Sequence, residues 1–237
     1  MSRLNDPELV RKEYESEAGL EARRAVYRSA EGPDATGMVF DAVAEIDPRR
    51  VLEVGCGMGQ LAERMHNGLE AEVVAIDQSE RMVELTRARG VDARLGDAQE
   101  LRFDDGEFDC VVAAWMLYHV PDVGRALDEI VRVLSSKGRL VAATNYPDHL
   151  VELFEFVGSA RLAAGTFNGE NAEHLLRTRF ANVERRDATG TVTFADRDAV
   201  RAYVEPSVAL YEGIDWVPEL DAPLVVRRRP VVFVADR

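Results

Sequence analysis

Residues Val51–Leu61 read VLEVGCGMGQL: an apolar run, three glycines, and the first leucine of a helical pattern. The β-branched start predicts a buried strand, and Leu61–Met65 predicts the beginning of a helix. A glycine-rich turn between a strand and a helix is the ligand-binding corner of a doubly wound α/β fold. Glycine is needed there because the backbone turns tightly and a ligand approaches with no Cβ in its way.

The spacing of these glycines argues against a dinucleotide ligand. They stand at Gly55, Gly57 and Gly59, whereas the dinucleotide fingerprint G-x-G-x-x-G needs its third glycine where Gln60 stands. Glu53 places a carboxylate beside the turn, where it would repel a phosphate and attract a cation. A ligand without a pyrophosphate is therefore favoured.

The segment Glu53–Gly59 resembles the first motif of class I S-adenosylmethionine (SAM)-dependent methyltransferases. SAM has no phosphate and carries a cationic sulfonium, which suits an acid before the turn. The chain looks most like the small-molecule methyltransferases of the ubiquinone and menaquinone biosynthesis type. The resemblance implies that the methionine part of SAM is held by Glu53, Gly55, Cys56, Gly57 and Gly59.

A second predicted strand, residues 73–77, ends at Asp77, 18 residues after Gly59. Neighbouring strands of a doubly wound sheet bring this acid beside the glycine turn, where a carboxylate can accept both ribose hydroxyls of an adenosine. The alternative is a helix cap, because a helical pattern starts directly after it. Gln78 is assigned to the same cofactor edge. Met82, in the following helix, packs either on adenine or in the core.

The step Gly96-Asp97-Ala98 follows a short third strand and resembles the adenine-recognition motif of the same methyltransferases. In that family an Asp side chain takes the adenine amino group, and the next backbone N–H reaches a ring nitrogen. The resemblance implies these roles for Asp97 and Ala98. An Asx-type turn is the alternative interpretation.

A fourth strand, Asp109–Trp115, is almost continuously apolar, as expected of a strand buried on both faces. Ligands of open parallel sheets bind outside the carboxyl ends of the strands, so the segment after this strand should form the floor of the site. We assign Ala114 to the cofactor and Tyr118 to the substrate. His119 is the best-placed candidate base, and the alternative is a histidine packed under the next helix.

Two segments outside this core are expected to cover the site. The N-terminal helices, residues 1–33, form either an ordinary amphipathic pair or a lid with Tyr14 and Arg23 turned toward SAM. After the fifth strand, a helical insertion over residues 146–169 closes the acceptor side. The residues assigned there to substrate binding are Asn145, Tyr146 and His149.

The predicted fold is α/β and Rossmann-like, as in class I methyltransferases: a mostly parallel seven-stranded sheet with an antiparallel C-terminal strand and helices on both faces. We expect a single domain over residues 1–237, with the basic cluster Arg227–Arg229 in a solvated loop; the alternative is that this cluster contacts an acidic substrate. Its expected parts are the lid (1–33), the SAM-binding core (34–145), the helical insertion (146–169) and the rest of the sheet (170–237), with a second helical insertion at about 196–229.

The 237 residues carry a net charge of −14, which argues against nucleic acids and anionic membranes as partners. Two isolated cysteines and four histidines without ligand spacing indicate neither a disulfide framework nor a metal site. The charged N-terminus shows no secretory signal, and no apolar run is long enough to span a bilayer, so a cytoplasmic location is expected. A monomer or a homodimer fits this sequence.

The expected reaction is an in-line displacement, in which an oxygen, nitrogen or carbon of a small-molecule acceptor attacks the methyl group and S-adenosylhomocysteine (SAH) leaves. Alignment of the reactants can supply about 7–11 kcal/mol, so the chemistry alone requires no catalytic side chain. Two alternatives stay open. One is a NAD-dependent oxidoreductase on the same fold, and the other is a non-catalytic SAM-binding or interaction protein.

Overall fold

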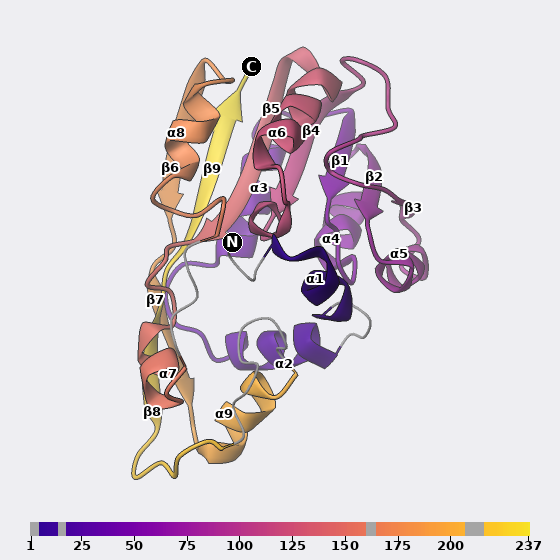
Figure 1. The fold of residues 1–237 in the computed structure, drawn as a ribbon. Helices are drawn as coiled ribbons and strands as arrows, with labels where there is room; N and C mark the ends of the chain where they lie inside the picture. Colours follow the sequence, from indigo (N-terminus) through magenta and orange to yellow (C-terminus); the bar gives the residue numbers. More distant parts are fainter. Residues whose placement is uncertain (1–4, 14–17, 160–164, 207–215) are drawn as a thin grey trace.

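The computed structural model of the chain describes residues 5–13, 18–159, 165–206 and 216–237 (Figure 1). The strands are β1 (Arg50–Val54), β2 (Glu72–Asp77), β3 (Asp92–Leu95), β4 (Phe108–Ala114), β5 (Leu134–Asn145), β6 (Asn182–Asp187), β7 (Gly190–Phe194), β8 (Leu224–Arg228) and β9 (Pro230–Asp236). The helices are α1 (Pro7–Glu13), α2 (Ala18–Tyr27), α3 (Ala35–Ala44), α4 (Gln60–Gly68), α5 (Glu80–Arg87), the 3-10 turn η2 (Leu117–His119), α6 (Val123–Val133), α7 (Val151–Phe156), α8 (Ala172–Arg177) and α9 (Arg197–Val204).

The main sheet has seven strands in the order β3-β2-β1-β4-β5-β9-β6. The first five run parallel, and β9 runs antiparallel to both of its neighbours. Because β1 lies between β2 and β4, the turns that follow these three strands meet at one edge. The predicted fold class is confirmed.

Side chains of the central strands alternate between two helical layers. Leu52 of β1 lies in the cluster that includes side chains of α6 and α8, whereas its neighbour Val51 lies in the cluster with α3, α4 and α5. Val111 and Val112 of β4 divide in the same way. Burial on both faces explains the near-continuous apolar sequence of these strands.

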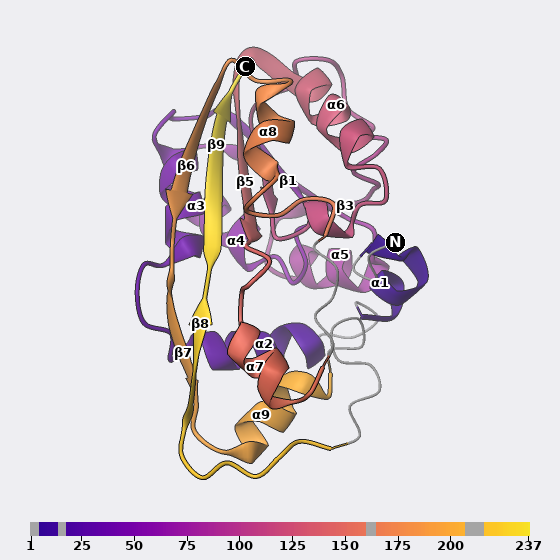
Figure 2. The ribbon, with the colours of Figure 1, turned by 60° about the vertical axis from the view of Figure 1, so that its left-hand side comes forward.

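A second, two-stranded sheet extends one side of the first. The chain passes from β6 into β7 and from β8 into β9, and β7 pairs antiparallel with β8. Figure 2 shows this ribbon running down from the main sheet toward α7, α9 and α2. We call α7, β7, β8 and α9 together the cap. Its own hydrophobic cluster contains Leu150, Leu153, Val157, Val192, Phe194, Val200, Tyr203, Val204, Val217 and Val226.

The cap differs from the sequence-based expectation over residues 196–229. We expected helix and a solvated arginine loop, but residues 224–228 form β8 and only α9 is helical in the described part of this range. Val226 and Arg228 are buried while Val225 and Arg227 are exposed, which is the period of a strand. An arginine at a buried position conceals this period in the sequence. Within the two expected insertions, residues 160–164 and 207–215 lie outside the described residues.

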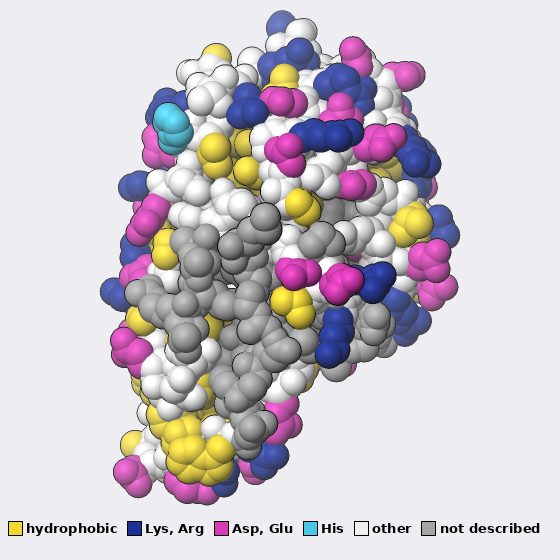
Figure 3. Space-filling model, viewed as in Figure 1, with side chains coloured by type: hydrophobic (Ala, Val, Ile, Leu, Met, Phe, Trp, Pro, Cys, Tyr) yellow, Lys and Arg dark blue, Asp and Glu magenta, His cyan; other side chains and the backbone are white. Residues whose placement is uncertain are grey.

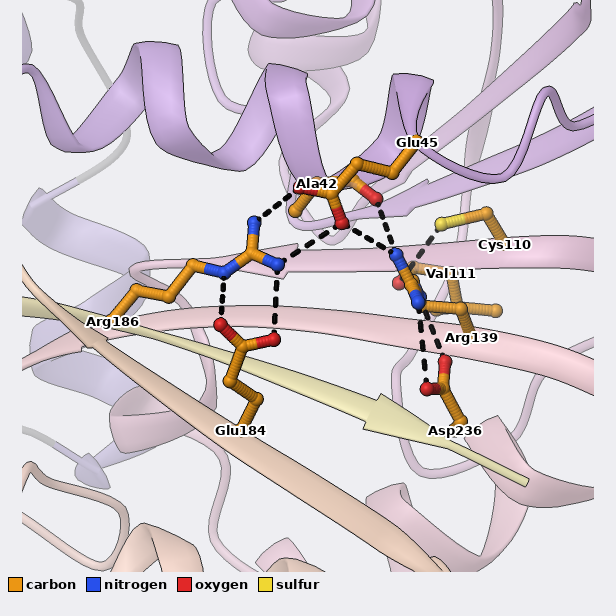
Figure 4. Close-up of polar contacts among 8 residues, drawn as sticks. All are labelled: Ala42, Glu45, Cys110, Val111, Arg139, Glu184, Arg186 and Asp236. Carbon is orange, nitrogen blue, oxygen red and sulfur yellow. Dashed lines mark hydrogen bonds and ion pairs between the residues drawn. The ribbon is translucent and has the colours of Figure 1, made fainter.

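Ion pairs tie β5, β9 and the edge strand β6 to the end of α3 (Figure 4). Glu45, directly after α3, accepts from Arg186 of β6 at 2.7 Å and from Arg139 of β5 at 3.0 Å. Arg139 also binds Asp236 of β9 at 2.7 Å, and Arg186 binds Glu184 at 2.9 Å. The hydrogen bond from Arg186, followed by the charge of both guanidinium groups, lowers the pKa of Glu45. The network fixes β6 and β9 against the parallel part of the sheet.

Acidic and basic side chains are interspersed over the face of the molecule that Figure 3 shows, rather than gathered by sign. None of the helices in the described ranges combines the length and the hydropathy that a bilayer crossing requires.

Candidate active site

The glycine turn joins β1 to α4, and each of its glycines has a positive φ: 72° at Gly55, 52° at Gly57 and 75° at Gly59. A Cβ at Gly55 would lie 2.6 Å from Met116 Cβ. A Cβ at Gly59 would lie 2.5 Å from Thr86 Oγ1 and 2.8 Å from its Cα. The turn therefore needs glycine both for its backbone conformation and for the close approach of its neighbours.

Asp77 lies beside this turn, as the strand order led us to expect. Its Oδ2 accepts from the backbone N–H of Gly57 at 2.9 Å, and its Oδ1 accepts from the N–H of Ser79 at 2.9 Å. Burial raises the pKa of Asp77, and the hydrogen bonds from Ser79 and Gly57 oppose that rise. Asp77 thus forms a local turn and also contacts the glycine turn, but it does not cap the next helix: the N-cap of α5 is Ser79, whose Oγ accepts from the N–H of Met82.

Glu53 is the second acid of the site and is only 3% exposed. The backbone N–H of Ala62, in the first turn of α4, bonds to the carboxylate, but Oε2 has no hydrogen-bond partner among the described residues. Burial, and next the negative charge of Asp77, raises the pKa of Glu53 to about 8. A buried carboxyl with an unmatched oxygen suits a cationic ligand group, because pairing would offset the cost of burial.

Cys56 has a packing role in the turn. Its Sγ lies 3.4 Å from Thr86 Oγ1, and Thr86 Oγ1 also donates to the carbonyl of Gly57 at 3.1 Å. Burial raises the pKa of the Cys56 thiol, so the thiolate is not available as a nucleophile.

The residues assigned to adenine lie at the next edge position, after β3. The backbone N–H of Gly96 bonds to the carbonyl of Asp77, which joins this segment to the end of β2. Asp97 is exposed, and its Oδ1 accepts from the N–H of Gln99 at 2.8 Å, so the Asx turn is present. Ala98 is buried, and Met82, in the first turn of α5, is fully buried. Gln78 is exposed beside Asp77.

The floor of the site follows β4. Ala114 is half-buried and pairs with Ala143 of β5. Trp115 takes a positive φ of 55° and donates from Nε1 to Asn145 Oδ1 at 3.3 Å. This bend leads into η2, where the half-buried rings of Tyr118 and His119 lie 4.4 Å apart.

Tyr146 and His149 lie where the main sheet meets the cap. Tyr146 donates its hydroxyl to Asp187 at 3.0 Å, and the guanidinium of Arg229 lies over its ring at 4.2 Å. His149 Nδ1 accepts from the backbone N–H of Arg229 at 2.8 Å, and its Nε2 lies 2.8 Å from the hydroxyl of Tyr27. Burial, and next the charge of Arg228, lowers the pKa of His149 to about 3.

The N-terminal segment reaches the glycine turn through Leu20 and Arg24 of α2. A Cβ at Gly57 would meet Leu20 of α2 at 3.7 Å, and no other atom of the described chain within 4 Å. When the amide of Gln60 is oriented so that its oxygen faces the two neighbouring guanidinium groups, that oxygen accepts from Arg24 of α2 at 2.7 Å and from Arg89 at 3.1 Å. Tyr14 lies outside the described residues, as does the side chain of Arg23. Leu20, Arg24 and Tyr27 are four and three residues apart, which places them on one face of a helix. This spacing was the signal in the sequence that could have identified the face of α2 that contacts the site.

Among the residues that the structure describes, no cluster of three or more His, Cys, Asp or Glu side chains could hold a metal ion.

Comparison with known proteins bears on the core of this site. A family model described as a methyltransferase domain matches residues 52–142. An uncharacterized methyltransferase of Mycobacterium tuberculosis is 37% identical over 133 residues, 53% of this chain and 52% of the relative. The demethylmenaquinone methyltransferase of Thermotoga maritima is 34% identical over 106 residues, 44% of this chain and 46% of the relative. The chain spans about half the length of the curated relatives it matches.

The fold is also similar over nearly the whole described chain to a solved structure. A SAM-dependent methyltransferase of Thermotoga maritima, named a possible histamine N-methyltransferase, matches with a TM-score of 0.58 at 22% identity. The match covers 92% of this chain and 94% of that one. Sequence and fold therefore confirm the resemblance predicted from the segment Glu53–Gly59.

Proposed function

We propose that this chain, which carries a methyltransferase domain over residues 52–142, moves a methyl group from SAM to a small-molecule acceptor. One observation carries this assignment: the buried carboxylate of Glu53, with Oε2 unmatched among the described residues, lies beside a turn of three positive-φ glycines. SAM offers an ammonium group and a sulfonium and has no phosphate. Its charge is therefore opposite to that of Asp77 and of the ionised form of Glu53, which a bound cation would favour.

The residues of the cofactor edge would divide the ligand among them. Glu53 and the glycine turn would hold the methionine part, and Asp77 the ribose hydroxyls. Asp97 and the backbone of Ala98 would hold adenine, although Asp97 must exchange part of its contact with Gln99 to do so. The other residues assigned to this ligand are Gln78, Met82 and Ala114, with Tyr14 and Arg23 from the N-terminal segment.

When bound, SAM supplies a methyl group that is already activated by a positively charged sulfur. The chain's task is then to align the acceptor, exclude water and receive a proton where the acceptor atom carries one. We assign proton transfer to His119, and contact with the acceptor to Tyr118, Asn145, Tyr146 and His149. The side chains of Asn145, Tyr146 and His149 already bond to other groups of the protein. We therefore expect them to shape the wall of the acceptor site rather than to bond to the acceptor.

The acceptor is proposed to be a small molecule for two reasons. The net charge of −14 disfavours polyanionic substrates. The cap also covers the edge of the sheet at which the acceptor would enter (Figure 1). The similarity to the demethylmenaquinone methyltransferase of Thermotoga maritima supplies one compound to test, demethylmenaquinone. We keep the sequence-based expectation that the enzyme is cytoplasmic and works as a monomer or homodimer.

The rival functions meet specific obstacles. A pyrophosphate would face two acids, the buried Glu53 and the half-buried Asp77, and Gln60 stands where the dinucleotide fingerprint has glycine. Its amide is also engaged by Arg24 and Arg89. These contacts disfavour NAD. A non-catalytic SAM-binding protein would keep every contact of the cofactor edge, so only turnover separates it from an enzyme.

Turnover with methyl-tritiated SAM tests the proposal. The acceptor panel should contain phenols, amines, activated carbon acids and demethylmenaquinone, and Asp77→Ala is the control for adventitious label. Labelled product from an acceptor, lost in Asp77→Ala, would support the proposed enzyme. NAD-dependent turnover without any labelled product would contradict it, and SAM binding without labelling across the panel would favour the non-catalytic alternative.

A further inference from the structure

Helix α2 contacts the glycine turn through Leu20 and Arg24. Leu20 covers the open side of Gly57, and Arg24 Nη1 donates to the amide oxygen of Gln60, the first residue of α4. A ligand held by the turn therefore shares the face of Gly57 with a side chain of α2.

The last residues of α2 contact the cap. Val26 packs against the hydrophobic cluster of the cap, and the hydroxyl of Tyr27 lies 2.8 Å from His149 Nε2. His149 precedes Leu150, a buried member of that cluster. The helix thus ends in both an apolar and a polar contact with the cap.

The bond between Tyr27 and His149 has a fixed direction. The backbone N–H of Arg229 donates to His149 Nδ1, so Nδ1 carries no proton. A neutral imidazole with an unprotonated Nδ1 carries its proton on Nε2, and that proton points to the oxygen of Tyr27. His149 thereby joins α2 to the junction of β8 and β9.

Between these two sets of contacts α2 is a continuous helix. Leu20 and Tyr27 are seven residues apart, or about 10 Å along the axis at 1.5 Å per residue. A helix of this length moves as one body, so a displacement at Leu20 reaches Tyr27.

We propose that α2 couples occupation of the glycine turn to the order of the cap, with the Tyr27–His149 hydrogen bond as the joint at the cap end. The coupling rests on the proposed function, because its ligand is SAM or SAH. It makes Tyr27 a positioning residue: it orders the acceptor side in response to the cofactor side. Coupling of this kind is reciprocal, so loosening the cap weakens cofactor binding.

Hydrogen exchange with and without SAH tests the coupling in the full chain, with SAH affinity measured by calorimetry. In the wild type, saturating SAH should slow exchange of amides in β7, β8 and α9 by about tenfold. In Tyr27→Phe the slowing should disappear, and the dissociation constant for SAH should rise by about fivefold or more, within the usual range of coupling factors. Arg24→Ala, which breaks the contact at the turn, should also remove the slowing.

Two controls keep the outcomes distinct. Ser29→Ala removes a hydrogen bond at the same end of α2, from Ser29 Oγ to the carbonyl of Val26, without touching His149, and should behave as the wild type. Amides of β4 and β5 report whether each variant is folded. The coupling is overturned if SAH binds but the cap amides exchange at the same rate with and without it. It is also overturned if SAH slows cap exchange in Tyr27→Phe as much as in the wild type. If SAH does not bind the wild type, the proposed function fails first and the coupling with it.

Discussion

The glycine turn and the cap lie at the same edge of the sheet, but the chain holds them in different ways (Figures 1 and 2). Backbone and side-chain atoms crowd the turn at Gly55 and Gly59, and the N–H groups of Gly55 and Cys56 bond to the carbonyl of Ile76. The cap has a small cluster of its own and meets the core through α2 and the strand junctions. A fixed turn suits a constant ligand part, and a separately packed cap suits a part that varies.

Two glycines give the sharpest comparison of these regions, and the largest expected effect. Gly59 in the turn and Gly158 near the cap both have positive φ, 75° and 65°. A Cβ at Gly59 would strike Thr86, while at Gly158 nothing lies within 4 Å in the described chain. Gly158→Ala should cost about 1–2 kcal/mol of unfolding free energy from backbone strain alone, and Gly59→Ala about 1–3 kcal/mol more from overpacking.

Urea unfolding and SAH titration of the two variants measure this difference. Gly59→Ala should lose SAH binding, while Gly158→Ala should retain it. Equal stability losses and equal affinities would mean that the turn is no more tightly fixed than the cap.

Arg228 tests the attachment of the cap. It is 5% exposed, and its guanidinium donates to the carbonyls of Glu31, Pro33 and Ala188. Arg228→Met should cost about 3 kcal/mol, because buried carbonyls lose charge-assisted bonds. Arg227→Met, at the exposed neighbour, should cost less than about 1 kcal/mol. Thermal unfolding of both variants measures the two losses of stability. A larger loss for Arg227→Met than for Arg228→Met would contradict the claim that the buried Arg228 attaches the cap.

Glu53 should make the turn sensitive to pH. Its pKa is raised from 4.5 to about 8 in the folded chain. The folded state then binds a proton that the unfolded state releases. The contribution of this protonation to the free energy of unfolding is complete below pH 4.5. It declines by about 1.4 kcal/mol per pH unit above that and is lost as the pH rises through 8.

Glu53→Gln should remove this decline, so the difference in unfolding free energy between wild type and variant should change across pH 5–8.5. Urea denaturation at several pH values measures it. Parallel pH profiles for the two proteins would show that Glu53 is not the buried acid described here.

Thr86 should give the smallest effect. Thr86→Val keeps the shape of the side chain but removes the bond from Oγ1 to the carbonyl of Gly57. A single neutral hydrogen bond contributes about 1 kcal/mol, so unfolding free energy should fall by that amount and SAH affinity only modestly. Loss of SAH binding in this variant would indicate that the turn depends on Thr86 more than on its glycines.

The sequence predicts the region around the turn well because its physical signals are local. Continuous apolar strands, the glycines of the turn and the acid at the end of β2 have one low-energy arrangement in a parallel sheet, and Asp77 lies where that arrangement puts it. The fold class follows from the same signals.

The cap is harder to predict because its signals are non-local. Arg228 is buried only because three carbonyls from distant segments surround it, so the sequence reads as a basic loop. Leu20 and Arg24 become part of the site only through the path of α2, which no local motif fixes. His149 is placed by contacts with Tyr27 and Arg229 from opposite ends of the chain.

The most direct test of the account is calorimetric titration of the chain with SAM, SAH and NAD, in the wild type, Asp77→Ala and Asp77→Asn. Asp77→Asn is the matched variant because it retains an acceptor for the N–H of Gly57 while losing the charge. We predict micromolar binding of SAM and SAH, no binding of NAD, and at least about tenfold weaker SAH binding in both variants. Binding of NAD, or SAH affinity that is indifferent to Asp77, would contradict the assignment of the glycine turn to SAM.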